Sequence, residues 1–420
     1  MYNISTLSNG IRVVTENISY VKSVSVGVWI GAGSAMEEYQ NNGVSHFIEH
    51  MLFKGTQNRT AKEIAEYMDR VGGQLNAVTS KEYTCYYAKT LSEHFEMAFE
   101  ILSDMIKNSI FSEDSIATER KVIAEEINMS DDTPEDYIHD CLSGLVWRNH
   151  ALGFPIAGTA ESIRGIDRGA LLSYRDGLYC GENMVISVVG NFDQAMVMAS
   201  LEDKFGRIKK SGALRKAQAK LEVVRGADIV KKDIEQCHVC LGLEGFSRSD
   251  KRLYDLLVVN SILGGNMSSR LFQRVREEMG LAYSIYSYAN TYQNNGSMVI
   301  YAGLNTDSLC GALGIIGDEI KTLKQNKLTA EEVSVAKEQM KASAIMGLEG
   351  MSSRMSSYGK SMLFENRVYS MDDTVSLIDR VNRDSVADVI DTVFDINRLN
   401  LAVLGRIEGE GKNIIDAVEF

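Results

Sequence analysis

Two stretches of this chain carry the same pattern of residues, and this repeat limits the folds open to the sequence more than any other feature. Each stretch, one beginning at Ser92 and the other at Thr306, has a capping residue, two amphipathic helices and an acidic start to the second helix. A helix and a pair of strands precede each copy. The copies start about 200 residues apart, which is far longer than the repeat of a solenoid. The sequence therefore predicts two domains of similar fold that arose by duplication.

Hydrophobic periodicity predicts the elements within the first copy and its upstream region. Alternating Val and Ile residues over 11–31 indicate two strands, and alternation over 74–91 indicates a strand pair. Helical patterns cover 43–54, 62–71, 94–108 and 115–129. Strands in runs with helices between them predict an α+β fold of two homologous domains, each a mostly antiparallel sheet with helices packed on one face.

The chain of 420 residues is too long for one hydrophobic core, which agrees with two domains. Seven lysines and arginines fall between Arg207 and Arg225 without apolar periodicity. We interpret this basic stretch as a solvated linker in preference to a nucleic-acid patch. The predicted boundaries are therefore 1–207 for the first domain, 208–225 for the linker and 226–420 for the second domain.

The overall charge argues against some classes of partner. Lys and Arg number 44 while Asp and Glu number 57, which gives a formal net charge of -13, whereas nucleic-acid binding needs a basic face. We find no apolar run long enough for a transmembrane helix and no secretory signal. Six cysteines in such a chain indicate reduced thiols. We expect a cytoplasmic protein that binds neither nucleic acid nor membrane.

The motif with the most specific chemistry is H-x-x-E-H, at His46, Glu49 and His50. Residues four apart lie on one face of a helix, so both imidazoles can reach one cation. Neutral imidazole is a good zinc ligand, and a catalytic zinc brings the pKa of its bound water towards neutrality. A carboxylate beside that water can take its proton and deliver it to a leaving amine. Two surface histidines on a polar helix face are the alternative, which the pattern disfavours because the chain has only six histidines.

A zinc site needs a third ligand, and the second helix of the first repeat copy offers Glu119, Glu125 and Glu126. Seven residues are close to two helical turns, so Glu119 and Glu126 point the same way while Glu125 projects from another face. One carboxylate of the aligned pair can bind the metal while the other orients a histidine. Taken alone, this helix favours a simpler interpretation, in which the acids form a charged surface with Arg120 and Lys121.

Together these motifs resemble the M16 metallopeptidases, the pitrilysin-like inverted zincins, and especially their half-length processing-peptidase branch. The resemblance covers essentially the whole chain and includes GVSHFIEHMLFKGT, GGQLNAVTSKEYTCYY, ERKVIAEEI and SSRLFQRVREEMGLAYS. It implies two homologous α+β halves of the LuxS/MPP-like metallohydrolase fold. It also implies one zinc ion per chain, held by His46, His50 and Glu126. Glu119 would be a supporting acid, and Glu49 the general base that activates a zinc-bound water.

The same resemblance implies roles for residues outside the two metal-binding helices. Arg276 and Tyr283, from the second half, would bind the substrate carbonyl or the oxyanion, where a guanidinium or phenol stabilises developing charge. Without the resemblance, they would be a helix-end arginine and a strand aromatic. Asn76 and Ala77 are similar to the edge-strand segment that pairs with an extended substrate backbone.

We therefore expect a zinc metalloendopeptidase that cleaves extended peptides or unfolded segments. Members of the family build a closed chamber from four such domains, so a chain with two implies a dimer. Because one chain carries both the metal residues and the Arg/Tyr pair, a homodimer is favoured. The alternatives are a catalytically silent peptide-binding or assembly subunit that works with a partner chain, and a zinc-dependent scaffold. The sequence leaves open whether targeting peptides are removed or peptides are cleared generally.

Overall fold

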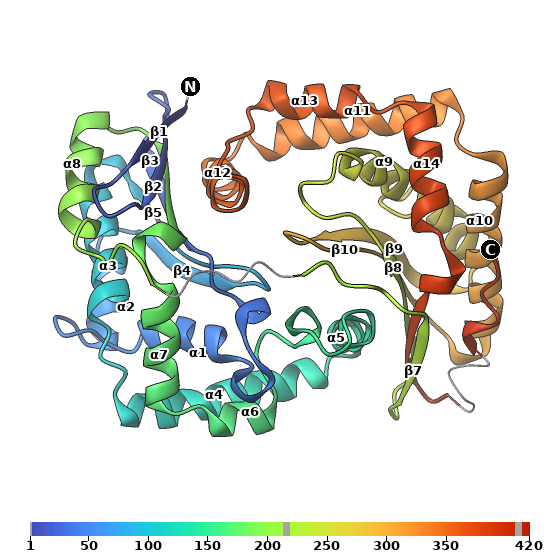
Figure 1. Cartoon of the computed structure of the whole chain (residues 1–420), viewed down its shortest axis with the longest axis horizontal. Coiled ribbons are helices and arrows are strands. Elements are labelled where there is room, and N and C mark those ends of the chain that lie inside the picture. The colour runs from blue at the N-terminus through green and yellow to red at the C-terminus, as the bar shows by residue number, and fades with distance from the viewer. Residues whose placement is uncertain (1, 213–218, 408–413) are drawn as a thin grey trace. The chain divides into compact units, whose positions relative to one another are not determined.

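The computed structural model describes residues 2–212, 219–407 and 414–420 of the chain. The chain forms two compact units, each built from three separate segments (Figure 1). The first unit consists of Met1–Asn128, Phe154–Ala217 and Met346–Tyr369, and the second of Met129–Gly153, Gln218–Ile345 and Ser370–Phe420. Residues 213–218, within the basic linker that the sequence predicts, lie outside the described residues.

A six-stranded sheet forms the centre of the first unit, in the order β1-β2-β6-β3-β5-β4. Its strands are β1 (Tyr2–Thr6), β2 (Arg12–Asn17), β3 (Ser23–Ile30), β4 (Gln74–Thr79), β5 (Thr84–Leu91) and β6 (Met184–Gly190). Every pairing is antiparallel except the parallel one between β2 and β6. The predicted mostly antiparallel sheet is therefore confirmed, with β1 and β4 at its edges.

Alternation along the strands gives this sheet two buried faces. Val24, Val26 and Val28 of β3 point to one face and join the larger hydrophobic core, whereas Trp29 points to the other face. Among the described residues, these helices contribute buried residues to the first face: α1 (Val44–Leu52), α2 (Ala61–Asp69), α3 (Phe95–Asn108), α4 (Glu113–Asp131), α6 (Ala160–Gly165), α7 (Arg168–Leu178) and α8 (Gln194–Phe205).

The second unit repeats this topology. Its sheet has the order β7-β11-β8-β10-β9, which corresponds to the order β2-β6-β3-β5-β4 of the first sheet. The parallel pairing, here between β7 and β11, falls at the same place. The strands are β7 (Gly226–Lys231), β8 (Cys237–Glu244), β9 (Ala282–Thr291), β10 (Gly296–Leu304) and β11 (Asn400–Gly405). This shared order confirms the two α+β domains of similar fold that the sequence repeat predicts.

The helices of the second unit follow the same plan. The core on one face of its sheet takes buried residues from α9 (Leu253–Leu263), α10 (Leu309–Asn326), α11 (Ala330–Gly347) and α14 (Arg383–Val393). A further helix, α13 (Met371–Asp379), precedes α14 in the chain.

The second face of each sheet is covered by a helix that comes from the other half of the chain (Figure 1). In the first unit, α12 (Met351–Glu365) packs on β3 and β6, and its Met355, Tyr358 and Met362 belong to the same buried cluster as Trp29. In the second unit, α5 (Pro134–Val146) packs on β8 and β11. The predicted consecutive domains, 1–207 and 226–420, do not include this exchange of helices.

A glycine and an ion pair fix α12 on the first sheet. A Cβ atom at Gly359 would lie 2.0 Å from Nε1 of Trp29, so the helix approaches the indole closely only because the residue is glycine. On β2, the carboxylate of Glu16 accepts hydrogen bonds from Arg354 at 3.1 Å and from the Tyr358 hydroxyl at 3.0 Å. The helix is thus held by both apolar and charged contacts.

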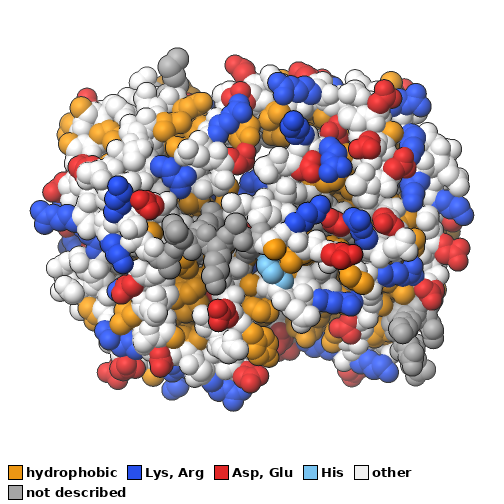
Figure 2. Space-filling view, viewed as in Figure 1, with side chains coloured by type: hydrophobic (Ala, Val, Ile, Leu, Met, Phe, Trp, Pro, Cys, Tyr) orange, Lys and Arg blue, Asp and Glu red, His pale blue; other side chains and the backbone are white. Residues whose placement is uncertain are grey.

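Acidic and basic side chains are interspersed over the described residues on the face drawn in Figure 2. This distribution agrees with a chain whose formal net charge is -13 and whose charged residues have both signs. In the part of the chain that the structure describes, no helix combines the length and the apolar character needed to cross a membrane.

Candidate metal centre

Helix α1 carries both motif histidines, and a buried carboxylate fixes where it begins. Glu37 accepts hydrogen bonds from the backbone N–H groups of Gly43 at 2.7 Å and Ser45 at 2.8 Å. Such groups at the start of a helix have no partner within it, and an acid there also suits the helix dipole. Gly43 has a φ of 92°, and a Cβ there would lie 2.6 Å from the carbonyl oxygen of Ala157. Glycine therefore sets the entry into α1.

Helix α1 has a buried side and a side that carries the histidines. Phe47, Ile48 and Met51 are buried in the core of the first unit. His46 and His50, one turn apart, are only partly buried, and their ring centres lie 4.6 Å apart. The structure thus places the two histidines together, as their spacing in the sequence predicts.

Helix α4 supplies the acids that meet these histidines. Ile116 and Ile123 bury one side of α4 in the same core. Glu119 is almost fully buried, with 3% of its side chain exposed, and Glu126 is 42% exposed. Both carboxylates reach the histidines, whereas Glu125 is an exposed residue outside the cluster. The seven-residue spacing therefore brings the same two acids together that it predicts.

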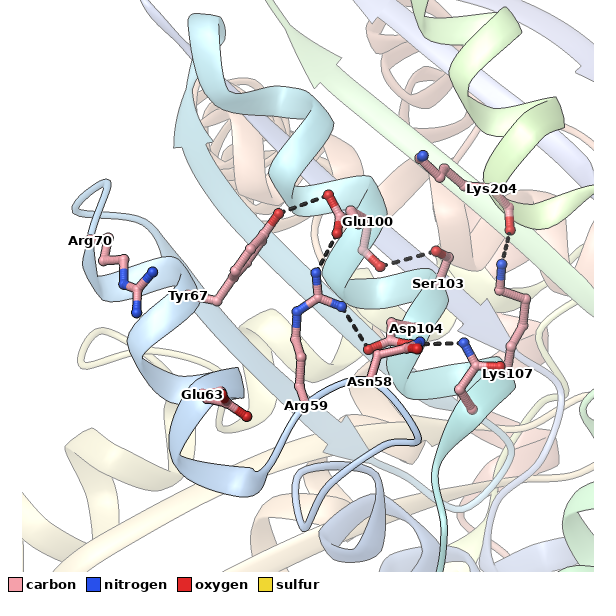
Figure 3. Close-up of a pocket in the computed structure, with 11 residues that line it drawn as sticks. Asn58, Arg59, Glu63, Tyr67, Arg70, Glu100, Ser103, Asp104, Lys107 and Lys204 are labelled. Carbon is pink, nitrogen blue, oxygen red and sulfur yellow. Dashed lines mark hydrogen bonds and ion pairs between the residues drawn. The ribbon is translucent and has the colours of Figure 1, made fainter.

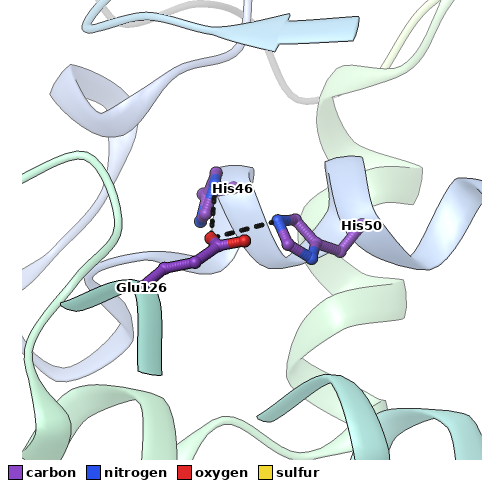
Figure 4. Close-up of side chains that lie close together, drawn as sticks. All are labelled: His46, His50 and Glu126. Carbon is purple, nitrogen blue, oxygen red and sulfur yellow. Dashed lines mark ion pairs between the residues drawn. The ribbon is translucent and has the colours of Figure 1, made fainter. Parts of the chain in front are cut away.

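The side chains of His46, His50 and Glu126 converge on one point (Figure 4). Oε2 of Glu126 lies 3.7 Å from Nε2 of His46 and 3.5 Å from Nε2 of His50. Tetrahedral zinc with bonds of about 2.0–2.2 Å places its ligand atoms roughly 3.3–3.6 Å from one another. The two carboxylate–imidazole separations lie close to this range, and all three ligand atoms lie within 4.8 Å of one another, so two imidazoles and a carboxylate here suit a zinc ion in chemistry and in approximate spacing.

The protonation of His46 and the hydrogen bond made by His50 also favour a cation at this point. Burial, helped by the neighbouring His50, lowers the pKa of His46 to about 4, so its imidazole is neutral at neutral pH. Nδ1 of His50 lies 3.1 Å from Oε2 of Glu119 and, as the donor, leaves the lone pair of Nε2 to face Glu126. A lone pair and a carboxylate oxygen facing each other are stabilised by a cation between them.

Lys54, which the sequence reasoning missed, completes a row of contacts behind His50. Its Nζ lies 2.8 Å from Oε1 of Glu119, whose other oxygen meets Nδ1 of His50. The buried carboxylate is therefore held between a cation and an imidazole, which fixes the orientation of the ring. The available signal was position, because Lys54 follows His50 by four residues in the same stretch, SHFIEHMLFKGT.

Glu49 projects from α1 next to His50 and is held by Thr79, a second residue that the sequence reasoning missed. The Thr79 hydroxyl donates a hydrogen bond to Oε2 of Glu49. Burial raises the pKa of Glu49, and hydrogen bonds from Thr79 oppose part of that rise. A raised pKa brings a carboxylate closer to the range in which it works as a general base.

The predicted peptide-binding segment lies at an open edge of the first sheet. In the described sheet β4 pairs with β5 alone, so its other side offers backbone groups to an added strand. The backbone N–H of Ala77 donates to Oδ1 of Asn76 at 2.8 Å. The acceptor of this N–H is thus a side chain of its own strand. A peptide carbonyl can take the place of that side-chain oxygen as the acceptor.

Arg276 and Tyr283 belong to the second unit, where the structure places them side by side. Arg276 lies in the π-helix η6 (Phe272–Glu278), and Tyr283 lies in β9. The guanidinium carbon is 5.8 Å from the centre of the Tyr283 ring and 4.6 Å from that of Phe272. Tyr283 is 77% exposed, so its phenol is open to a ligand.

A polar cavity of about 550 Å³ in the first unit is lined, among the described residues, by none of the predicted site residues (Figure 3). Arg59 donates to Asp104 at 2.8 Å and to Glu100, and Tyr67 donates to Glu100 at 2.8 Å. These charged groups satisfy one another. We interpret the side chains that line this cavity as a structural network that holds α2 and the residues before it against α3.

Known proteins share the sequence pattern of this chain. The sequence profile described as Insulinase (Peptidase family M16) matches residues 12–160, and the one described as Peptidase M16 inactive domain matches residues 165–340. A protein of Bacillus subtilis that is named an uncharacterized zinc protease is 44% identical over 384 residues. The match covers 91% of this chain and 93% of that protein.

Solved structures share the fold. A protease from Helicobacter pylori matches with a TM-score of 0.90 over 96% of this chain and 99% of that chain, at 23% identity. A chain of complex III2 from Candida albicans, with Inz-5 bound, has a TM-score of 0.86 over 100% of both chains, at 18% identity. At these identities the likeness concerns the fold alone.

Proposed function

The chain belongs to peptidase family M16, and on that premise we propose that it is a zinc-dependent metalloendopeptidase that cleaves extended peptides or unfolded segments. The observation that carries this proposal is the convergence of the ligand atoms of His46, His50 and Glu126 within 4.8 Å of one another. Glu49 stands next to His50 on the same helix. A surface helix with unrelated histidines would have no reason to gather these groups.

In this proposal one zinc ion per chain is held by Nε2 of His46, Nε2 of His50 and the carboxylate of Glu126. Glu119 supports His50 through Nδ1 and so keeps the tautomer that leaves Nε2 free to bind metal. When bound, zinc supplies a Lewis acid that polarises the scissile carbonyl and makes water easier to deprotonate.

Glu49 acts as the general base. It takes a proton from the attacking water and then delivers it to the leaving amine, a role that its partly buried position and raised pKa support. Arg276 and Tyr283, side by side in the second unit, would stabilise the negative charge that develops on the carbonyl oxygen.

The substrate would add as a strand to the open edge of β4, at Asn76 and Ala77. The Ala77 N–H becomes available to a peptide carbonyl when the Asn76 side chain turns away. Strand addition requires a substrate whose own backbone groups are free. This requirement limits substrates to extended peptides and unfolded segments.

We also propose that the protein works as a homodimer that encloses a chamber, in the cytoplasm. One chain contains both the metal cluster and the Arg276–Tyr283 pair, so no unlike subunit is needed to supply either. The six cysteines are all free thiols, as expected in a reducing compartment. The alternative, a catalytically silent peptide-binding or assembly subunit, is worth testing because a chain of complex III2 has the same fold.

The test is to incubate the purified, zinc-loaded protein with a pool of unstructured peptides and to follow fragments by mass spectrometry, beside Glu49→Gln. We expect fragments from the wild type alone, because Glu49→Gln keeps its fold and zinc but cannot accept a proton. Turnover by Glu49→Gln would remove Glu49 as the base. No fragments from the wild type, despite one bound zinc per chain, would favour the silent subunit.

The ligand assignment has its own matched pair of variants. Glu125 and Glu126 are adjacent acids on α4, but only Glu126 belongs to the cluster in the described structure. We expect Glu126→Ala to lose far more zinc than Glu125→Ala, measured as metal content after dialysis. Equal loss in the two variants would undo the assignment of Glu126.

A further inference from the structure

Thr79 is the last residue of β4, and its side chain meets the proposed base. The Thr79 hydroxyl donates to Oε2 of Glu49. Thr79 also pairs with Thr84 in the register of β4 and β5. The Thr84 hydroxyl is fully buried and donates to the backbone carbonyl of Ala32 at 2.9 Å. A carboxylate on α1 is thus connected to the first sheet through one threonine.

The direction of these hydrogen bonds follows from the chemistry of a hydroxyl, which has one proton to donate. The proton of Thr84 goes to Ala32 and that of Thr79 goes to Glu49, although the two hydroxyl oxygens are 3.4 Å apart. The hydroxyl of Thr79 bonds to Oε2 of Glu49, and the backbone of Thr79 forms a further hydrogen bond to the same carboxylate. A carboxylate held by one residue in this way keeps one orientation, which favours proton transfer.

The strand that ends at Thr79 is also the strand proposed to bind the substrate. Thr79 lies two residues after Ala77, whose N–H bonds to Asn76 in the same strand. A peptide that adds to the edge of β4 therefore lies along the element that holds Glu49.

We propose that Thr79 is a positioning residue, which holds Glu49 in the orientation for proton transfer and ties that orientation to the strand that binds the substrate. The inference rests on the proposed function, because it takes Glu49 as the base and β4 as the binding edge. Loss of the hydroxyl then slows turnover and leaves peptide binding intact, since Thr79 acts on Glu49 and not on the peptide. A threonine that only ends a strand would instead affect peptide affinity, or would affect stability equally whether or not Glu49 is present.

The kinetic test compares Thr79→Val, which removes the hydroxyl at nearly constant volume, with Thr79→Ser, which keeps it. We expect kcat of Thr79→Val to fall about 10- to 100-fold, with KM changed less than about threefold, and Thr79→Ser to recover most of the loss. Thr90→Val is the matched control, because Thr90 lies in β5 and its buried hydroxyl has no hydrogen-bond partner among the described residues. A rise in KM at unchanged kcat, or equal losses in Thr79→Ser and Thr79→Val, would overturn the proposal.

A second measurement needs neither zinc nor turnover. In the metal-free protein, Thr79→Val, Glu49→Met and the double variant form a double-mutant cycle of melting temperatures. We expect Thr79→Val to lower the melting temperature of the wild type and to shift that of Glu49→Met much less. Additive shifts would overturn the proposal. If the wild type cleaves no peptide, the proposed function fails by itself, and the cycle still decides whether Thr79 holds Glu49.

Discussion

Among single residues, Lys54 illustrates how a side chain outside the metal cluster supports it. Lys54 contacts Glu119, Glu119 contacts His50, and His50 faces Glu126. The Lys54 side chain is 36% exposed whereas that of Glu119 is 3% exposed, so a half-solvated cation stabilises a buried anion. Removing one partner of such a pair leaves a buried charge less well compensated.

Replacing Lys54 by methionine keeps most of the side-chain length and removes the charge. We expect Lys54→Met to lower zinc affinity about 10- to 100-fold, because Glu119 then holds His50 less firmly, and Lys54→Arg to retain most of it. Competition with a chromophoric chelator measures this affinity. Lys62→Met is the control, since Lys62 is 83% exposed on α2. Wild-type affinity in Lys54→Met would contradict the row of contacts.

His139 on α5 gives the second unit a pH-dependent stability. Its Nδ1 lies 2.8 Å from the hydroxyl of Tyr288, and its Nε2 lies 3.2 Å from that of Tyr286. The other groups that face it are Tyr301, Cys240, His238 and Asp136. Burial lowers the pKa of His139 below its ordinary value of 6.5, and the charge of Asp136 opposes the shift. The unfolded chain then binds more protons just below that pH, so stability is lost as the pH falls.

We expect His139→Gln to lose less stability than the wild type between about pH 7.5 and about pH 5.5, by at most about 1.4 kcal/mol per pH unit. The glutamine does not titrate in this range, so it removes the proton-linked part of the loss. Urea unfolding at both pH values measures the difference. Equal losses in the two proteins would show that another group carries the pH dependence.

The residues of the metal cluster differ in how far the sequence could predict them. Helix spacing alone predicts that His46 and His50 lie on one face of their helix, and that Glu119 and Glu126 lie on one face of a second helix. The structure places them so. Their roles as ligands stay a prediction. Lys54 could not be predicted from spacing, because its contact with Glu119 depends on how α1 packs on α4.

Among the helices, α12 depends on one glycine for its contact with the first sheet. We expect Gly359→Ala to destabilise the protein by about 1–3 kcal/mol, because its Cβ would overlap the buried indole of Trp29. Gly314→Ala in α10 is the control, since a Cβ there meets nothing within 4 Å, and we expect it to be neutral or stabilising by up to about 1 kcal/mol. Urea unfolding compares the two. Equal effects would show that α12 can shift to admit a methyl group.

The hydrophobic periodicity predicted the helices and strands better than it predicted which sheet each helix packs against. The strand pair expected over 74–91 and the helix expected over 94–108 correspond to β4, β5 and α3. An amphipathic pattern shows that a helix buries one side, but it does not show which sheet receives that side. For this reason the exchange of α5 and α12 could not be predicted, although the repeat of the two sheets could.

At the scale of the whole molecule, each compact unit needs segments from both halves of the chain. A fragment of residues 1–217 contains all six strands of the first sheet but not α12, which leaves the sheet face around Trp29, Val185 and Val189 uncovered. We expect this fragment alone to aggregate or to bind a hydrophobic dye, and to regain a cooperative melt when residues 218–420 are coexpressed. Size-exclusion chromatography and thermal melting test this. A monomeric fragment with a cooperative melt would contradict it.

The position of α12 in the sequence also determines how long the first sheet stays incomplete during synthesis. The ribosome completes β6 at Gly190 but reaches Glu365, the end of α12, only 175 residues later. At about 5–20 residues per second, the nascent sheet keeps one apolar face bare for roughly 10–35 s. We expect the unfinished chain to be prone to aggregation during that interval, because its apolar surface is exposed. We therefore expect the yield of folded protein to depend on the speed of translation between Gly190 and Glu365.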